Sequence, residues 1–345
     1  RQHLRAQRLA PARDRTQPAY PRIRRAQHPQ SGWREKHITH STLRDDAHTF
    51  IYVEFRHPRR YYRHTNAQAW RGKFTDAAYS TLQLPGPQGQ LQARMYSSKV
   101  GASKPLIIYF HGGGWVIGDL ISHHPFCQQL REHTGCTVVA VDYRLAPEHP
   151  CPAALQDCLA ATHWLARHAE SIGPSNGSFV LAGDSAGGHL AACTGLALGP
   201  DMLARLAGAL LIYPVVDHYS HPYPSHIECA RGQTLTSGIM RWFWDTWLAG
   251  QGAEDAAAAG ALLARRNDLH TLPNCLLVTA ERDPLRDEGR ALGSALEGAG
   301  VPLTLQHYAD AEHGFACSQG PGKDFQHFMA LTRQWLDTLH STGHR

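Results

Sequence analysis

Two serines stand in the pattern Gly-x-Ser-x-Gly, which can present a hydroxyl as the nucleophile of an acyl transfer. Ser175, in residues 173–177, lies in a Pro-containing turn before an apolar run, so we predict no chemistry for it. Ser185, in residues 183–187, follows that run and opens a helix-like stretch. Because a sharp strand-to-helix turn projects the hydroxyl away from the backbone, Ser185 is the candidate nucleophile.

A serine hydroxyl at neutral pH needs a base and a group that orients the base. Asp283 follows an apolar run at 275–280, and His313 follows a run that ends near Tyr308. If both runs are parallel strands, their carboxyl ends lie at the same edge of the sheet as Ser185. The chain order Ser, Asp, His is the order expected for an α/β-hydrolase.

Each of these partners has a competitor in the sequence. Asp287 could replace Asp283 as the acid, but its place near the start of a predicted helix favours a role in helix N-terminal charge. His307 falls inside a predicted strand, whereas His313 lies in a loop beside small residues that leave room for an imidazole. We therefore predict Asp283 as the orienting acid and His313 as the base.

A run of three glycines supplies the fourth element of this chemistry. The sequence His-Gly-Gly-Gly at 111–114 directly follows an apolar run. Glycines leave backbone N–H groups unshielded, so this loop is a candidate oxyanion hole together with the N–H of Ala186, the residue after the nucleophile. His111 itself is predicted to hold the loop in place, not to act as a base.

A sheet is needed to position these residues. Short apolar runs alternate with helix-length segments, which indicates an α/β fold with a mostly parallel central sheet flanked by helices. The runs 80–84 and 90–96 predict a hairpin around a Pro- and Gly-rich turn. The predicted buried strands are 105–110, 137–141, 178–182, 209–213, 275–280 and 303–308.

One interval breaks this rhythm. No strand is predicted from 217 to 268, and residues 240–248 form an aromatic-rich helix candidate. An insertion of this length is best interpreted as a helical cap above the sheet. Its aromatic side chains either line an acyl or aryl pocket or serve packing alone; they are Trp242, Phe243, Trp244 and Trp247.

Charge separates the N-terminal part from the rest of the chain. Residues 1–75 hold 17 Lys and Arg against 5 Asp and Glu, whereas the other 270 residues hold 17 against 24. A mildly acidic body argues against a nucleic-acid-binding protein. Residues 1–50 are dominated by Arg, His, Gln and Pro, so we expect much of this segment to be loosely ordered.

The domain prediction has four parts. Residues 1–76 are a basic N-terminal extension, either partly disordered or part of the cap, and removal of residues 1–45 should leave the fold intact. Residues 77–216 and 269–345 form the two parts of the core, and residues 217–268 form the cap insertion.

The cysteines and the hydropathy pattern bear on location. The eight Cys form no Cys-x-x-Cys pair, and Cys136, Cys193 and Cys275 sit in apolar segments, so we expect reduced structural thiols and a cytoplasmic protein. No apolar stretch approaches the ~18 residues of a membrane span, and we predict no secretory signal. No metal or organic cofactor is expected.

Together these motifs resemble the hormone-sensitive-lipase family of α/β-hydrolases, in its bacterial esterase branch with the GDSAG motif. The matching segments agree in order and spacing over about residues 79–340; they are 111–120 (HGGGWVIGDL), 142–150 (DYRLAPEHP), 183–188 (GDSAGG), 283–289 (DPLRDEG) and 313–315 (HGF). Members of this family usually carry N-terminal helices that complete the cap, whereas residues 1–75 show no convincing amphipathic pattern.

The resemblance implies a carboxylester hydrolase that acts on short to medium acyl or aryl esters through an acyl-enzyme intermediate. The roles it implies are Ser185 as nucleophile, His313 as base, Asp283 as orienting acid, and Gly113, Gly114 and Ala186 as oxyanion donors. It also implies that Arg144 and Glu148 form buried polar contacts. The alternatives are an amide or carbamate hydrolase with the same residues and a non-catalytic small-molecule receptor.

The predicted partner is a small-molecule ester. We expect no nucleic acid partner and no membrane span, and we allow for a homodimer.

Overall fold

The structure is a computed structural model that describes residues 58–74, 78–99, 101, 103–231 and 234–339. Its eight strands are β1 (Ser80–Gly86), β2 (Gly89–Tyr96), β3 (Leu106–Phe110), β4 (Val138–Val141), β5 (Phe179–Asp184), β6 (Leu206–Ile212), β7 (Asn274–Arg282) and β8 (Leu303–Glu312). Each predicted strand overlaps one of them, because short apolar runs mark buried strands. The predicted loose order of residues 1–50 lies outside the described residues.

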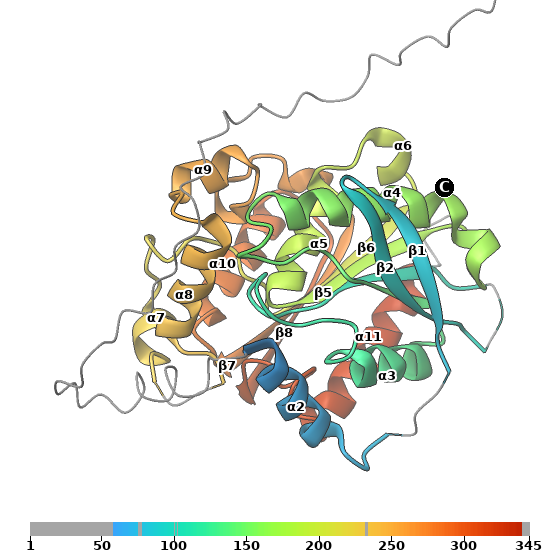
Figure 1. Ribbon diagram of the computed structural model, residues 1–345, viewed down its shortest axis with the longest axis horizontal. Coiled ribbons are helices and arrows are strands. Elements are labelled where there is room, and N and C mark those ends of the chain that lie inside the picture. The colour runs from blue at the N-terminus through green and yellow to red at the C-terminus, as the bar shows by residue number, and fades with distance from the viewer. Residues whose placement is uncertain (1–57, 75–77, 100, 102, 232–233, 340–345) are drawn as a thin grey trace, which may run out of the picture. The chain divides into compact units, whose positions relative to one another are not determined.

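The strands form a single sheet in the order β1-β2-β4-β3-β5-β6-β7-β8 (Figure 1). β1 and β2 pair antiparallel, and β2 pairs antiparallel with β4. Every other pairing in the sheet is parallel. The predicted hairpin and the predicted mostly parallel α/β sheet are therefore confirmed.

Two strands extend beyond their predicted ends. The apolar runs stop at 280 and 308, but β7 continues to Arg282 and β8 to Glu312, and these two residues pair across a register shift after Ala280. Hydropathy detects burial and not pairing, so it missed these more polar ends. The extra pairing brings the residues that follow the two strands, 283 and 313, side by side.

Helices cover both faces of the sheet. They are α2 (Pro58–Trp70), α3 (His124–Thr134), α4 (Ala153–Ile172), α5 (Ala186–Leu196), α6 (Pro200–Leu203), α7 (Pro224–Glu228), α8 (Ser237–Leu248), α9 (Ala253–Ala258), α10 (Arg286–Gly298) and α11 (Lys323–Leu339), with the 3-10 turns Leu263–Arg265 and Leu269–Thr271. Helices α4, α5 and α10 pack with Leu106 and Ile108 of β3 on one face. Helices α3 and α11 pack with Ile107 and Tyr109 on the other, as alternating strand side chains require.

Helix α2 was not predicted by the hydropathy pattern. Its anchors are polar: the Arg59 guanidinium donates to the carbonyl of Val116 at 2.8 Å, and the Trp70 indole N–H donates to the carbonyl of Cys317 at 2.8 Å. These bonds join α2 to the loop after the glycine run and to the loop after His313. The Trp70 ring is also buried against Phe325, but one buried aromatic side chain at the end of a helix gives little apolar periodicity to detect.

The segment between β6 and β7 contains helices α7, α8 and α9, and its described residues include no strand. Within the part of the chain that the structure describes, no helix is both long and apolar enough to cross a membrane.

Candidate active site

The backbone turns sharply where β5 meets α5. Ser185, between them, has a backbone φ of 54°, in the left-handed region that residues other than glycine rarely adopt. A Cβ at Gly183 would lie 2.3 Å from the carbonyl of Gly187, and a Cβ at Gly187 would lie 2.0 Å from the Phe110 oxygen. Because only glycine fits at these two positions, the motif 183–187 is a steric requirement of the turn.

The structure brings the three predicted catalytic side chains together. The His313 Nε2 atom lies 3.0 Å from the Ser185 Oγ atom, and His313 Nδ1 lies 2.7 Å from Asp283 Oδ2. All three residues are buried, and Asp283 is fully so. A carboxylate accepts hydrogen bonds only, so the Nδ1–H of a neutral imidazole donates to Asp283 and leaves Nε2 free to accept from the serine hydroxyl.

Strand pairing and short-range bonds hold this row of side chains. The His313 backbone N–H donates to the Arg282 carbonyl at 3.3 Å, across the paired ends of β7 and β8. The second oxygen of Asp283 accepts the Leu285 N–H at 2.8 Å. The carboxylate is therefore held from two sides and cannot rotate freely.

The two competitors lie elsewhere. Asp287 stands in the first turn of α10, where its carboxylate accepts from Arg286 and from the Ser225 N–H. His307 lies within β8 and contacts Thr279 and Glu281. Neither residue contacts His313 or Ser185 in the described structure.

The glycine loop leaves backbone N–H groups free near Ser185. The Gly112 N–H donates to Asp184, and the Gly113 carbonyl accepts from two later amides of the same loop. Within the described part of the chain, the N–H groups of Gly113 and Gly114 have no hydrogen-bond partner. The Ala186 N–H belongs to the first turn of α5, where amides have no partner inside the helix. These three donors are available to an oxygen anion.

The His111 imidazole is uncharged at neutral pH. Burial, together with the neighbouring His123, lowers the pKa of His111 to about 4. Its ring stacks on Tyr143 with centroids 4.3 Å apart, and the Tyr143 hydroxyl donates to the His111 carbonyl at 2.6 Å. These contacts hold the start of the glycine loop, and they give His111 a structural role and not that of a base.

Asp184 is a buried residue of the site that sequence reasoning missed. Its carboxylate accepts from the Tyr109 hydroxyl and, at 2.8 Å, from the Gly112 N–H, and it lies 3.5 Å from His123 Nε2. Burial alone would raise the pKa of Asp184, but His123 and these hydrogen bonds hold it below its usual value. Asp184 thus ties the glycine loop to the residue beside Ser185. A carboxylate inside an otherwise apolar strand end was the available signal.

The aromatic residues of α8 divide into two groups. Trp244 and Trp247 are buried and pack on Trp115, with the Trp115 and Trp247 rings stacked at 4.0 Å, so they serve packing. Phe243 lies against the glycine loop instead, because a Cβ at Gly114 would lie 2.1 Å from its Cγ atom. Trp242 is partly buried against the core.

The segment 142–150 differs in part from the prediction. Arg144 binds the buried Asp157 with two contacts of 2.7 Å, as expected of a buried polar contact. Glu148 is exposed and pairs with Arg59 of α2, so the expectation of a buried contact there is wrong. The partner of Glu148 comes from a helix that the sequence did not predict.

Among the described residues, no group of three or more His, Cys, Asp or Glu side chains is arranged to hold a metal ion.

Comparisons with known proteins agree with this architecture. The model of the alpha/beta hydrolase fold family matches residues 107–317. The chain is 36% identical over 242 residues to the carboxylic ester hydrolase LipN of Mycobacterium tuberculosis, a match that covers 68% of this chain and 63% of LipN. It is 37% identical over 241 residues to the esterase LipI of the same organism, covering 68% and 73%. The chain thus spans less than two thirds of the length of LipN.

Two solved structures are similar over most of the chain. The hyperthermophilic esterase from the archaeon Pyrobaculum calidifontis superposes with a TM-score of 0.76 at 32% identity, covering 82% of this chain and 90% of that one. The thermostable carboxylesterase EstE1, cloned from a metagenomic library, gives 0.74 at 32% identity, covering 82% and 96%. The chain therefore belongs to the hormone-sensitive-lipase family of α/β-hydrolases, whose matched members are esterases and lipases, as its motifs predicted.

Proposed function

We propose that the protein is a serine carboxylester hydrolase that forms an acyl-enzyme intermediate on Ser185. The observation that carries this proposal is the unbroken row of contacts from the Ser185 hydroxyl through His313 to Asp283. A serine with a positioned base and an orienting carboxylate is the arrangement that activates a hydroxyl for acyl transfer.

In the first half of the reaction, Ser185 Oγ attacks the ester carbonyl carbon, and His313 Nε2 takes the hydroxyl proton. The imidazolium that forms is stabilised by the Asp283 carboxylate. His313 then gives the proton to the departing alcohol oxygen as the carbon–oxygen bond breaks. Water repeats the sequence on the acyl-enzyme, so the acid is released and Ser185 regains its proton.

The tetrahedral intermediate carries its negative charge on the former carbonyl oxygen. We assign the N–H groups of Gly113, Gly114 and Ala186 as the donors to this oxygen, because they are free of other partners and lie on the glycine loop and in the first turn of α5, beside Ser185. Donors that are fixed before the reaction need no reorganisation when the charge develops, which is why they lower the barrier.

We further propose that residues 217–268 form a cap over this site and that residues 77–216 and 269–345 form the core. The support is Phe243 of α8, whose ring lies against Gly114 of the glycine loop. A rigid ring at this place limits the room beside the reacting carbonyl, which favours short to medium acyl or aryl esters as substrates.

Hydrolysis of a series of chromogenic esters, from acetyl to palmitoyl, tests the proposal. We expect the highest kcat/KM among the short and medium chains, and no turnover above background when Ser185→Ala is assayed at the same concentration. Undiminished hydrolysis by Ser185→Ala would show that the activity does not use this site.

A further inference from the structure

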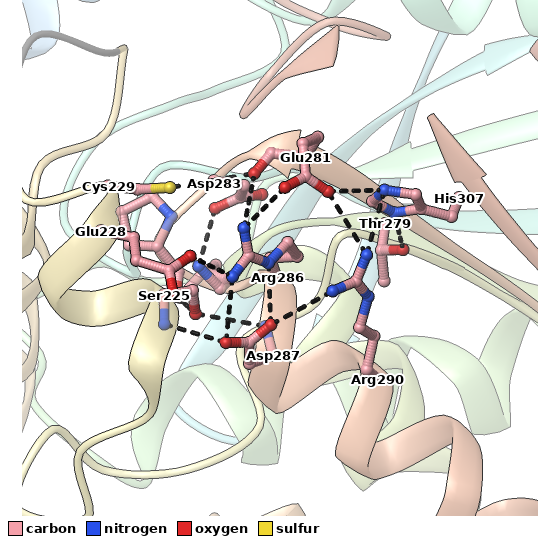
Figure 2. A network of polar contacts seen from close by, with 12 residues as sticks. Ser225, Glu228, Cys229, Thr279, Glu281, Asp283, Arg286, Asp287, Arg290 and His307 are labelled. Atoms are coloured by element: carbon pink, nitrogen blue, oxygen red, sulfur yellow. Dashed lines mark hydrogen bonds and ion pairs between the residues drawn. The ribbon is translucent and has the colours of Figure 1, made fainter. Parts of the chain in front are cut away.

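A network of charged and polar side chains surrounds the loop that carries Asp283 (Figure 2). We define the acid loop as residues 281–287. Figure 2 shows that side chains from α7, β7, β8 and α10 converge on this loop from different directions. The charged and titratable groups that contact the acid loop or lie in its network are His226, Glu228, Cys229, Glu281, Arg282, Asp283, Arg286, Asp287, Glu288, Arg290, His307, Glu312 and His313.

Ser225, in the first turn of α7, connects this helix to the acid loop through three hydrogen bonds. Its hydroxyl donates to the Pro284 carbonyl at 2.6 Å and accepts the Asp287 N–H at 3.2 Å. Its own N–H donates to the Asp287 carboxylate at 2.9 Å. Ser225 is fully buried, so water does not compete for these bonds. Pro284 directly follows Asp283, and the Ser225 hydroxyl therefore holds the peptide next to the catalytic carboxylate.

Arg286 reinforces the same connection. Its guanidinium bonds three carboxylates from three elements: Glu228 of α7 at 2.5 Å, Glu281 of β7 at 2.8 Å and Asp287 of α10 at 2.8 Å. The Arg286 side chain is only 9% exposed, so these bonds offset the cost of burying its charge. Hydrogen bonding to Arg286 in turn holds the pKa of Asp287 below its usual value. Glu281 before Asp283 and Pro284 after it are thus both connected to α7, Glu281 through Arg286 and Pro284 through Ser225.

We propose that Ser225 is a positioning residue for the reaction, which acts by holding the acid loop so that the Asp283 carboxylate stays aligned with His313. This inference rests on the proposed function, because it assigns a role in the same site. It couples the 217–268 segment, to which α7 belongs, to the orienting acid. Loss of the Ser225 hydroxyl removes its bonds to the Pro284 carbonyl and to the Asp287 N–H, while the chain keeps both the Asp283 and the His313 side chains.

The test is the steady-state kinetics of Ser225→Ala with a short chromogenic ester. Misalignment of a catalytic group by a fraction of an ångström lowers the rate of the chemical step more than it lowers binding. We expect kcat to fall about tenfold with KM nearly unchanged.

The pH profile supplies a readout that a merely structural role would not move. The titratable groups in contact with His313 are Asp283 and Tyr213. A well-aligned Asp283 favours the imidazolium, so a misaligned one should shift the acid limb of the kcat/KM profile of Ser225→Ala to lower pH. A loss of activity with the acid limb unmoved would overturn the proposal.

Ser237→Ala is the matched control. Ser237 is also a buried serine of the same segment, and its hydroxyl donates at 2.5 Å to the His226 carbonyl of α7, but it has no contact with the acid loop. Its kcat and pH profile should equal those of the wild type. Equal effects of the two substitutions would show that general loosening of α7, not the bond to the acid loop, causes the loss, and would overturn the proposal.

A second pair of variants decides the matter if Ser225→Ala does not fold. Glu228→Gln removes an exposed carboxylate that binds Arg286, and Glu254→Gln removes an exposed carboxylate that binds Arg265 in the same segment, away from the acid loop. We expect Glu228→Gln to lower kcat about twofold to threefold, with the same shift of the acid limb, and Glu254→Gln to change neither. Identical kinetics for both would overturn the inference. A wild-type protein without Ser185-dependent hydrolysis would instead overturn the proposed function together with it.

Discussion

The chain contains the same five-residue pattern twice, 10 residues apart, and the two copies have different structures. Ser175 and Ser185 are almost equally buried, at 6% and 7% exposure, so burial does not separate them. The Ser175 hydroxyl accepts the Gly177 N–H at 3.2 Å within a local turn, whereas Ser185 Oγ faces the imidazole of His313 at 3.0 Å. The serine of such a motif becomes a candidate nucleophile only when the rest of the fold places a base next to its hydroxyl.

The first glycines of the two copies are also under different steric constraints. A Cβ at Gly183 would approach the backbone of Gly187 to 2.3 Å, whereas a Cβ at Gly173 would meet its nearest atom at 3.3 Å. Gly173 has an extended backbone that any residue adopts, with φ −177°. Gly183 and Gly187 of the second copy are thus required by close packing between backbone segments, and Gly173 of the first copy is not. Gly177 of the first copy has a left-handed backbone instead, with φ 84°.

The largest expected difference between the two serines is chemical reactivity. An organophosphonate that phosphonylates activated hydroxyls should label Ser185 and leave Ser175 unmodified, because only Ser185 has a base. Ser185→Ala should abolish labelling and lower kcat by about 10⁵-fold or more, whereas Ser175→Ala should change neither. Peptide mass mapping after labelling locates the modified serine, and a label on Ser175 would show that this serine is activated as well.

The next largest effect is the loss of kcat on substitution of Asp283, which orients the base beside Ser185. Asp283→Asn should lower kcat about 10³- to 10⁴-fold, because an amide no longer fixes the imidazole tautomer or stabilises the imidazolium. Asp287→Asn serves as the control, since Asp287 contacts Arg286 and Ser225 but not His313. Its kcat should stay within about tenfold of the wild type. Steady-state kinetics of both variants checks this, and a larger loss for Asp287→Asn would move the acid assignment to that residue.

The glycines give a smaller effect, on stability. Gly183→Ala should lower the free energy of unfolding by about 3 kcal/mol, because the new Cβ overlaps backbone that cannot move independently. Gly173→Ala should change it by less than about 1 kcal/mol. Urea denaturation of both variants measures the difference. Comparable losses would mean that the two motifs are under the same steric constraint.

The smallest effect is on the pH dependence of stability. His189, on α5 behind Ser185, is fully buried, and burial lowers its pKa to about 4. In the unfolded chain a histidine has a pKa near 6.5, so it binds a proton at a higher pH than the buried His189 does in the folded chain. The unfolded state is therefore favoured progressively as the pH falls from about 6.5 to about 4, and the free energy of unfolding decreases over that range. We expect a loss of about 2 kcal/mol between pH 7 and pH 5 from this group.

Replacement of that histidine should reduce the pH dependence. His189→Gln should flatten the slope of unfolding free energy against pH, and the exposed His168 near the first motif provides the control variant His168→Gln, with an unchanged slope. Chemical denaturation at pH 7 and pH 5 measures both. An unaltered slope in His189→Gln would contradict the assignment of this acid sensitivity to His189 of α5.

Much of the fold was predictable from local patterns. Buried parallel strands need short apolar runs, and every predicted run overlaps a strand. The turn at Ser185 and the glycine loop were visible because their steric requirements fall on consecutive residues. The chain order Ser185, Asp283, His313 predicted which side chains meet, and the structure places them in contact.

Other features depend on residues far apart in the chain. The ends of β7 and β8 pair through polar residues that hydropathy does not mark. Helix α2 is held by Arg59 and Trp70, which bind backbone oxygens more than 50 residues away. The division of the α8 aromatics between packing on Trp115 and contact with Gly114 is likewise invisible in a list of residue types.

The sequence alone determined the fold class and the candidate Ser, Asp and His residues, because backbone sterics and hydrophobic periodicity are local properties. The family came from the resemblance of its motifs to those of a known family. The tertiary structure decided which groups hold the surrounding loops in place: Asp184 binds the N–H of Gly112 in the glycine loop, and Ser225 of α7 binds the Pro284 carbonyl in the acid loop. Such bonds form between segments that meet only after the sheet is assembled. Their partners are therefore set by three-dimensional proximity, and they stand at no characteristic separation along the chain that a sequence motif could reveal.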